Sequence, residues 1–356
     1  PLPIPNRAVK RASADNSPDL IGVKVGHGLR TMHFFCIIIW GMKWWIIAIL
    51  SLVVIGSLVV IYSRDREMVS PVVKILERPL DKYTIENLGR REYKSQIFID
   101  DEISPGVFKF HFDSDGKKVT GLAHMPKNCP CPVIAQFRGY VERDIYQPGM
   151  GTKRTAEVFA KNGFISLALD FLGYGGSDNP PNDVFEERFL TYVAGLNLLA
   201  GIESWERAGS VGIWGHSNGG QIALTVLEIS QKEYPTVLWA PVSKPFPYSI
   251  LYYTDEAEDR GKALRKKLAD FEEDYDVELY SLMNYLDRIK APVLIQQGTG
   301  DEAVPKKWND ALVVQIKKVN PNLKVNYFIY PGADHNLTPG WNSVVNRDVE
   351  FYKKSW

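Results

Sequence analysis

A serine between closely spaced glycines is the strongest chemical signal in the sequence. The pentapeptide GHSNG at 215–219 follows an apolar segment and precedes a helical pattern. A sharp strand-to-helix turn of this type lifts the serine hydroxyl above a sheet and aims helix N-terminal amides at developing negative charge. We therefore expect Ser217 to be a nucleophile. The alternative is a glycine-rich turn with an incidental serine.

A serine hydroxyl needs a base to remove its proton, and His335 is the candidate. Of the six histidines, His335 alone lies C-terminal to Ser217, in a loop after the last predicted strand. His216 fills the variable position of the pentapeptide and is expected to point away from the line of attack. The chain order serine, acid, histidine then requires an acid between the two.

Asp301 is the expected acid, because it follows the predicted strand 292–297 at the edge where sites of parallel sheets gather. Its carboxylate would hold the histidine tautomer and stabilise the protonated ring. Glu302 and Asp334 are the competitors. Glu302 would point the opposite way from its neighbour, and Asp334 is too close to His335 in the chain to face its ring easily.

Two backbone amides are expected to bind the oxyanion. One is the N–H of Asn218, and the other is the N–H of Tyr140, after Gly139 in the loop that follows the strand 132–137. The alternative for this loop is an ordinary turn. No cysteine–histidine cluster suggests a metal, and the glycine-rich stretch 170–178 lacks a phosphate-binding lysine, so no cofactor is expected.

Alternating strand and helix patterns indicate how these residues are positioned. Together they predict an α/β fold with a mostly parallel sheet, helices on both faces and an antiparallel hairpin at the front. The segment 241–290 lacks a strand signal and is expected to be a small helical cap insertion. Strands are predicted at 107–112, 119–124, 132–137, 164–169, 210–214, 236–239, 292–297 and 324–330, and helices at 152–162, 184–203, 221–229, 306–318 and 342–353.

An uncharged apolar run at 44–62 is long enough to span a bilayer as a helix, and tryptophan and tyrosine flank it. We expect a single-pass signal anchor with the catalytic domain outside the cytoplasm, although the lysines and arginines after the run favour the opposite orientation. The expected organisation is a disordered tail (1–43), the anchor (44–63), a linker with a leading strand (64–104) and the catalytic domain (105–356).

Composition supports a packed domain and excludes some partners. The chain has 42 basic and 42 acidic residues, so no basic surface suggests a nucleic-acid partner. Of the three cysteines, Cys129 and Cys131 are two positions apart, where a disulfide would be strained. We expect them to be two partly buried thiols, and they do not decide the compartment.

Together, the Ser217-Asn218-Gly219-Gly220 run, the stretch 298–305 and His335 resemble the catalytic domain of the prolyl oligopeptidase family, within the α/β-hydrolase superfamily. Dienelactone-hydrolase-like esterases share these motifs. The resemblance covers about residues 105–356 and implies cleavage of short peptides through an acyl-enzyme. Two features depart from the family. Too few residues lie between anchor and hydrolase for a β-propeller, and Phe137 stands where the family often has an oxyanion-binding tyrosine.

Three functions remain open at this stage. The first is a membrane-anchored serine peptidase acting on short peptides, and the second is a carboxylesterase acting on small esters. The third is a membrane-tethered binding protein with an inactive hydrolase fold, against which the apparently complete triad argues. The acidic, tyrosine-rich segment 241–290 could favour a cationic or apolar substrate group. The oligomeric state is left open.

Overall fold

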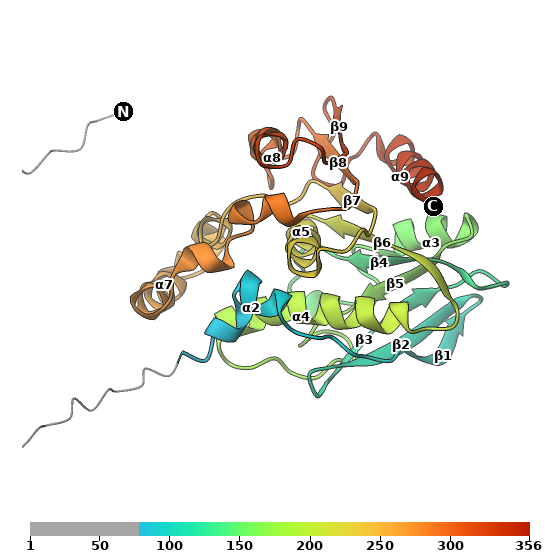
Figure 1. Ribbon diagram of the computed structural model, residues 1–356, viewed down its shortest axis with the longest axis horizontal. Coiled ribbons are helices and arrows are strands. Elements are labelled where there is room, and N and C mark those ends of the chain that lie inside the picture. Colours follow the sequence, from blue (N-terminus) through green and yellow to red (C-terminus); the bar gives the residue numbers. More distant parts are fainter. Residues whose placement is uncertain (1–77) are drawn as a thin grey trace, which may run out of the picture. The chain divides into compact units, whose positions relative to one another are not determined.

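The computed structural model describes residues 78–356, in which one nine-stranded sheet lies between two layers of helices (Figure 1). The strand order is β1-β2-β3-β5-β4-β6-β7-β8-β9. The first three strands are antiparallel, whereas the pairs from β5 to β9 are all parallel. The strands are β1 (Phe98–Ser104), β2 (Val107–Ser114), β3 (Lys117–His124), β4 (Cys131–Phe137), β5 (Ile165–Leu169), β6 (Ala208–His216), β7 (Thr236–Trp239), β8 (Val293–Gly298) and β9 (Val325–Tyr330).

The predicted hairpin is present as β2 and β3. Ser114 pairs with Lys117 across a two-residue turn in which Asp115 and Gly116 have φ angles of 53° and 78°. Positive φ at both central residues matches the right-handed twist of the strands, which is why aspartate and glycine are favoured there.

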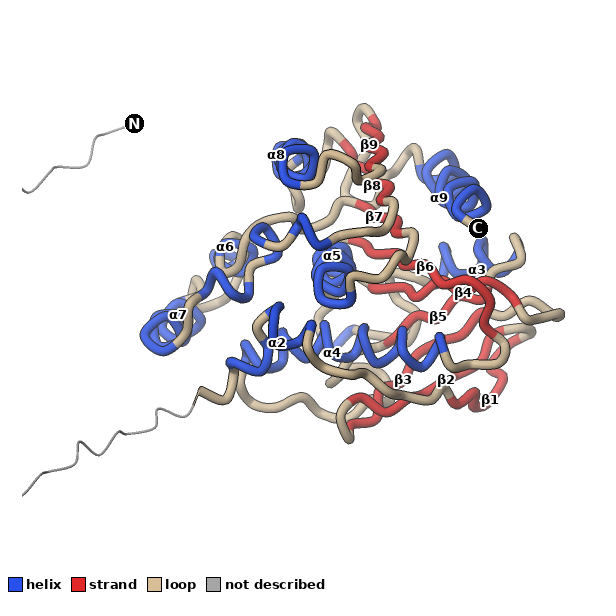
Figure 2. Tube along the Cα trace, viewed as in Figure 1, coloured by secondary structure: helices blue, strands red, loops and turns tan. Residues whose placement is uncertain are grey.

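Helices cover both faces of the sheet, as Figure 2 shows. One layer contains α4 and α5 and the other contains α3 and α9, and two separate groups of buried apolar side chains fill the two interfaces. This arrangement is the α/β-hydrolase fold that the sequence predicts. The longer helices are α3 (Lys153–Lys161), α4 (Val184–Glu203), α5 (Asn218–Ser230), α7 (Lys262–Asp274), α8 (Lys306–Val319) and α9 (Trp341–Ser355), and the short ones are α2 (Ile85–Gly89) and α6 (Tyr248–Leu251).

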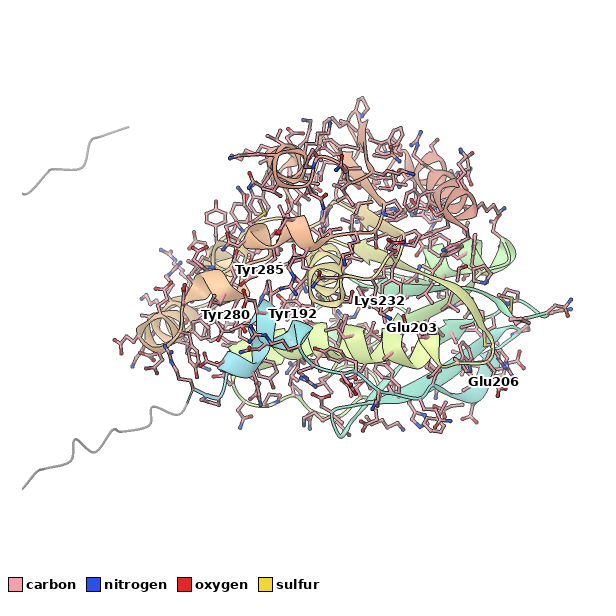
Figure 3. All side chains as sticks on the ribbon, viewed as in Figure 1. Tyr192, Glu203, Glu206, Lys232, Tyr280 and Tyr285 are labelled. Atoms are coloured by element: carbon pink, nitrogen blue, oxygen red, sulfur yellow. A yellow bond between two sulfur atoms is a disulfide. The ribbon has the colours of Figure 1, made fainter. Side chains whose placement is uncertain are left out.

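The segment 241–290 contains α6, α7 and several 3₁₀ turns, and none of its residues belongs to a strand. Tyr280, labelled in Figure 3, attaches it to the rest of the fold. Its ring stacks on Phe189 of α4 with centroids 4.9 Å apart, and its hydroxyl donates to the Leu80 carbonyl at 3.2 Å. The insertion therefore rests on the apolar surface of α4.

The region predicted as linker contains a folded element before its leading strand. Helix α2 buries Ile85 and Leu88, and its N-cap Thr84 accepts a bond from the Asn87 amide at 3.2 Å. A five-residue helix is too short for a periodic sequence signal, so its stability depends on packing. The predicted tail, the anchor at 44–62 and the start of the linker lie outside the described residues. Within residues 78–356, no helix is both long and apolar enough to cross a bilayer.

The prediction of two free thiols is wrong. Cys129 and Cys131 form a disulfide, and their Cα atoms are 4.7 Å apart. The turn before β4 brings the two Cα atoms within the range that disulfides use. The spacing of the two cysteines alone does not specify the shape of this turn.

Candidate active site

Ser217 occupies a strained turn between β6 and α5. Its φ and ψ angles are 56° and −120°, a combination that non-glycine residues rarely adopt. Backbone bonds hold the turn: the Ser217 amide donates to the Trp239 carbonyl at 2.9 Å, and the Ser217 carbonyl accepts from the amides of Gly220 and Val242, each at 3.0 Å. The predicted strand–serine–helix geometry is therefore present.

Two glycines make room for this turn. A Cβ on Gly219 would lie 1.9 Å from the Phe137 carbonyl oxygen, a distance that no side chain can tolerate. A Cβ on Gly139 would lie 3.2 Å from the Cβ of Ser217. The loop after β4 and the start of α5 are thus in direct contact around the serine.

Asp301 and His335 form the second part of the site. The Nδ1 atom of His335 lies 3.1 and 3.0 Å from the two carboxylate oxygens of Asp301. The carboxylate also accepts bonds from the Val304 amide at 2.8 Å and the Gln297 side-chain amide at 3.0 Å. Burial alone would raise the pKa of Asp301, but these bonds outweigh it and the pKa is lowered. Asp301 is therefore a carboxylate that orients the ring through Nδ1–H.

The two competing acids lie elsewhere. Glu302 is exposed. The side chain of Asp334 accepts bonds from the amides of Asn336 and Thr338, each at 2.9 Å, and so holds its own loop.

In the described part of the chain, the His335 ring forms hydrogen bonds with Asp301 only, and the Ser217 hydroxyl makes none to it. For the predicted triad to act, a serine–histidine bond would have to form during the reaction, as catalytic bonds that are long in ligand-free structures do.

His216, predicted to point away from the attack line, contacts His335. Its Nε2 atom lies 3.0 Å from the His335 carbonyl oxygen, and the two ring centroids are 4.7 Å apart. No sequence signal could have shown this contact, because 119 residues separate the two positions.

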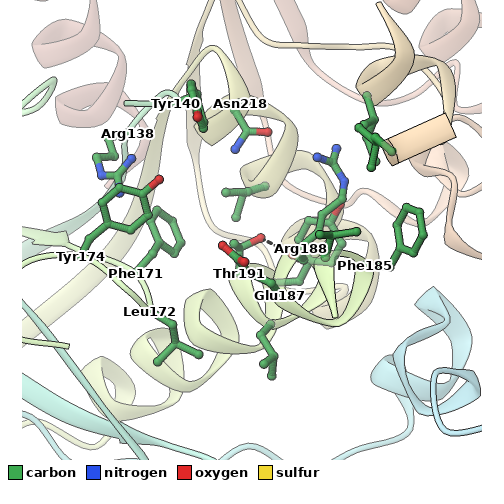
Figure 4. Close-up of a pocket in the computed structure, with 16 residues that line it drawn as sticks. Arg138, Tyr140, Phe171, Leu172, Tyr174, Phe185, Glu187, Arg188, Thr191 and Asn218 are labelled. Carbon is green, nitrogen blue, oxygen red and sulfur yellow. Dashed lines mark hydrogen bonds between the residues drawn. The ribbon is translucent and has the colours of Figure 1, made fainter. Parts of the chain in front are cut away.

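The expected oxyanion donors, Asn218 and Tyr140, line the same cavity (Figure 4). Asn218 is the first residue of α5, so its amide has no partner within the helix. Phe137 is fully buried against Phe171 and does not line this cavity. Its side chain therefore packs into the core and does not face a substrate.

Arg138, for which the sequence carries no signal of a role in the site, contacts the loop that contains Tyr140. Its guanidinium is buried and donates to the carbonyls of Gly139 and Asp170, each at 2.9 Å. It also lies 4.1 Å from the ring centroid of Tyr174. These contacts attach Arg138 to the loop that contains Tyr140, the second predicted oxyanion donor.

The cavity that Asn218 and Tyr140 line has a volume of about 440 Å³ and mostly apolar walls, and Ser217 and His335 are not among its lining residues. The loop 170–178 contributes Phe171, Leu172 and Tyr174, and the insertion contributes Ile250 and Leu264. Figure 4 shows Tyr140 and Asn218 at one end, with Arg138 on one side and Arg188 on the other. Its lining residues are Arg138, Tyr140, Phe171, Leu172, Tyr174, Val184, Phe185, Glu187, Arg188, Leu190, Thr191, Tyr192, Asn218, Ile222, Ile250 and Leu264.

The charged groups of this cavity are two arginines and one glutamate. Glu187 is paired with Arg143, whereas the Nε of Arg188 has no hydrogen-bond partner among the described residues. The acidic residues of the insertion, such as Glu272 and Glu273, are exposed on α7 and do not line the cavity. Two arginines and one glutamate thus line the cavity, and the Arg138 guanidinium also interacts electrostatically with the nearby Asp170 carboxyl group.

No group of three metal-binding side chains lies together within residues 78–356. The chemistry that this site can support is nucleophilic: a partly exposed serine, a buried carboxylate bonded to a partly buried histidine, and two backbone amides near one apolar cavity.

The sequence matches a known protein family. Residues 151–355, more than half of the chain, match the pattern that defines the prolyl oligopeptidase family. No curated protein sequence is similar enough to count as a relative.

Solved structures share the fold at low sequence identity. Acetyl xylan esterase 1 from Thermoanaerobacterium sp. JW/SL YS485 superposes with a TM-score of 0.56 at 16% identity, over 77% of this chain and 94% of that one. Est1E from Butyrivibrio proteoclasticus, solved with ferulic acid, gives 0.51 at 19% identity, over 68% and 97%. A puromycin-hydrolyzing peptidase of Mycobacterium tuberculosis gives 0.53 at 15% identity, over 72% of this chain and 40% of that one.

Proposed function

Because the chain belongs to the prolyl oligopeptidase family and is a serine hydrolase, we propose that it hydrolyses small carboxylic esters through an acyl-enzyme on Ser217. The observation that carries the choice of substrate is the lining of the cavity next to Asn218, whose charged groups are two arginines and a glutamate paired with Arg143. An ester with an apolar, uncharged or anionic acyl group fits a cavity with mostly apolar walls and two arginines.

The proposed mechanism is acyl transfer in two halves. His335 accepts the Ser217 proton as Oγ attacks the substrate carbonyl carbon, and the amides of Asn218 and Tyr140 stabilise the oxyanion. The ring, held by Asp301, then protonates the departing alcohol as the carbon–oxygen bond breaks. Water repeats the sequence on the acyl-enzyme, releases the acid and restores the serine.

Cleavage of short peptides is the second candidate, and family membership favours it. An aminopeptidase-like enzyme would need a carboxylate to bind the substrate's free amine, and the one carboxylate that lines the cavity, Glu187, is already paired with Arg143. If peptides are substrates, we therefore expect those with a blocked N-terminus to be cleaved better.

The decisive experiment compares three substrates on the full chain: p-nitrophenyl butyrate, benzyloxycarbonyl-Gly-Pro-p-nitroanilide and Gly-Pro-p-nitroanilide. We expect the highest kcat/KM on the ester and the lowest on the free-amine peptide. A preference for the free-amine peptide would overturn the proposal in favour of an aminopeptidase. A fluorophosphonate probe separates both enzymes from a non-catalytic binding protein, because Ser217→Ala should abolish labelling. Equal labelling of this variant would remove the nucleophile assignment.

We also propose that residues 44–62 anchor the protein in a bilayer with the hydrolase outside the cytoplasm. The Cys129–Cys131 disulfide supports this orientation, because disulfides persist mainly in oxidising compartments. Alkaline extraction of membranes tests the anchor, and protease digestion of intact cells tests the orientation. Release of the protein by alkali would contradict the anchor. Protection of the hydrolase from protease in intact cells would contradict the orientation.

A further inference from the structure

His216 makes a contact that the proposed chemistry does not use. It is the last residue of β6, directly before Ser217, and about nine-tenths of its surface is buried. Its side chain lies, with Trp214 and Trp239, against a second cavity of about 560 Å³. From there, its Nε2 reaches the backbone carbonyl of His335 at 3.0 Å.

The direction of this hydrogen bond follows from its two atoms. A carbonyl oxygen can only accept, so Nε2 of His216 carries the proton and donates it. Burial, and secondarily the neighbouring His335 ring, lower the pKa of His216 to about 4. The ring is thus neutral at ordinary pH, with Nδ1 unprotonated.

Hydrogen bonds hold the loop on both sides of His335. At His335 itself, the backbone has only the bond from His216 within residues 78–356. The Gly300 amide donates to the Ala333 carbonyl at 2.9 Å, and Asp334 holds the amides that follow. Among the described residues, the bond from His216 is the one hydrogen bond made by the His335 backbone. The rings of the same two residues are also in contact, in a tilted arrangement with their planes inclined at 38°.

We propose that His216 is a positioning residue, whose donated hydrogen bond and ring contact set the location of the His335 base relative to Ser217. The inference rests on the proposed function, since it assumes that Ser217 and His335 react together. The side chain of His216, the residue directly before Ser217, connects the turn that holds the nucleophile to the backbone of His335. A shift of about 1 Å in such a pair can reduce the rate of reaction about 100-fold.

Two substitutions separate the hydrogen bond from the ring. His216→Phe keeps an aromatic ring of similar shape but has no donor, whereas His216→Gln keeps an N–H at a similar reach. For the full chain and the butyrate ester, we expect His216→Phe to lower kcat about 10- to 100-fold with KM changed less than about threefold. We expect His216→Gln to stay within about fivefold of the wild-type kcat. Equal kcat values for the wild type and the phenylalanine variant, or equal losses in the two variants, would overturn the inference.

A double-mutant cycle excludes a general structural effect. If His216 acts through His335, the rate of fluorophosphonate labelling in a His335→Ala background should fall less than about threefold when His216→Phe is added. An undiminished effect in that background would show that His216 acts on the fold or on Ser217 directly. If His335→Ala alone labels like the wild type, the proposed triad fails, an outcome distinct from failure of the inference.

Discussion

The buried neutral state of His216 predicts a specific loss of stability on acidification. Its pKa is about 4 in the folded protein, because burial and the nearby His335 disfavour the charged ring more than Asp301 and Asp334 favour it. The ordinary value, expected in the unfolded chain, is 6.5. Between these two pH values the unfolded state binds a proton that the folded state excludes.

The sign and size of the effect follow from this difference. The free energy of unfolding is unaffected by His216 above about pH 6.5, falls as pH decreases through the interval, and is lower by about 3 kcal/mol once both states are protonated. At about pH 5 the expected loss is about 2 kcal/mol.

The matched variant is His216→Gln, which cannot titrate in this range. Urea unfolding of the full chain, followed by tryptophan fluorescence at about pH 7.5 and about pH 5, should show a wild-type loss larger by about 2 kcal/mol than that of the variant. Burial also lowers the pKa of His124, but this residue is present in both proteins and cancels. Equal losses in the two proteins would refute the assignment of a buried neutral His216.

Three further predictions concern the site and the disulfide. Asp301→Asn should lower kcat about 10⁴-fold by favouring the wrong histidine tautomer. The lowered pKa of Asp301 should also stabilise the fold above the ordinary pKa of this group, and this contribution is lost as pH falls through the lowered pKa. In urea unfolding at acid pH, the free energy of unfolding of the asparagine variant should therefore decrease less than that of the wild type. Gly139→Ala would place a Cβ 3.2 Å from that of Ser217, so we expect at least about a tenfold loss of kcat/KM with an unchanged circular dichroism spectrum; wild-type kinetics would contradict the described contact. Intact mass should rise by about 2 Da on reduction of Cys129 and Cys131, and an unchanged mass would show free thiols.

The architecture was largely predictable because strand and helix periods are local properties of the chain. Helix α4 (Val184–Glu203) and strand β7 (Thr236–Trp239) have the predicted bounds, and the hairpin turn follows from an aspartate–glycine pair. The short helix α2 was missed because five residues carry too little periodic signal. The disulfide was misjudged because its feasibility depends on the shape of a turn, which residue spacing does not specify.

The site was partly predictable for the same reason. Ser217 was predicted as the nucleophile from its immediate neighbours, and Asp301 and His335 as its partners from their places after parallel strands, whose carboxyl ends meet at one edge. The hydrogen bonds between Asp301 and His335 agree with that order. The prediction for His216 was incomplete. Side-chain alternation indicates that its ring points away from the line of attack, but it does not indicate the contact with the His335 carbonyl oxygen.

The sequence by itself determined the type of chemistry available to this protein: a serine on a strained turn, with an acid and a histidine in the required order and glycines where backbone passes close. Only the tertiary structure decided which side chains surround that chemistry. Arg138 and Arg188 enter one cavity from a loop and a helix, and His216 reaches His335 across 119 residues. Such contacts depend on how twisted strands and packed helices align in space, and no local pattern in the chain encodes that alignment.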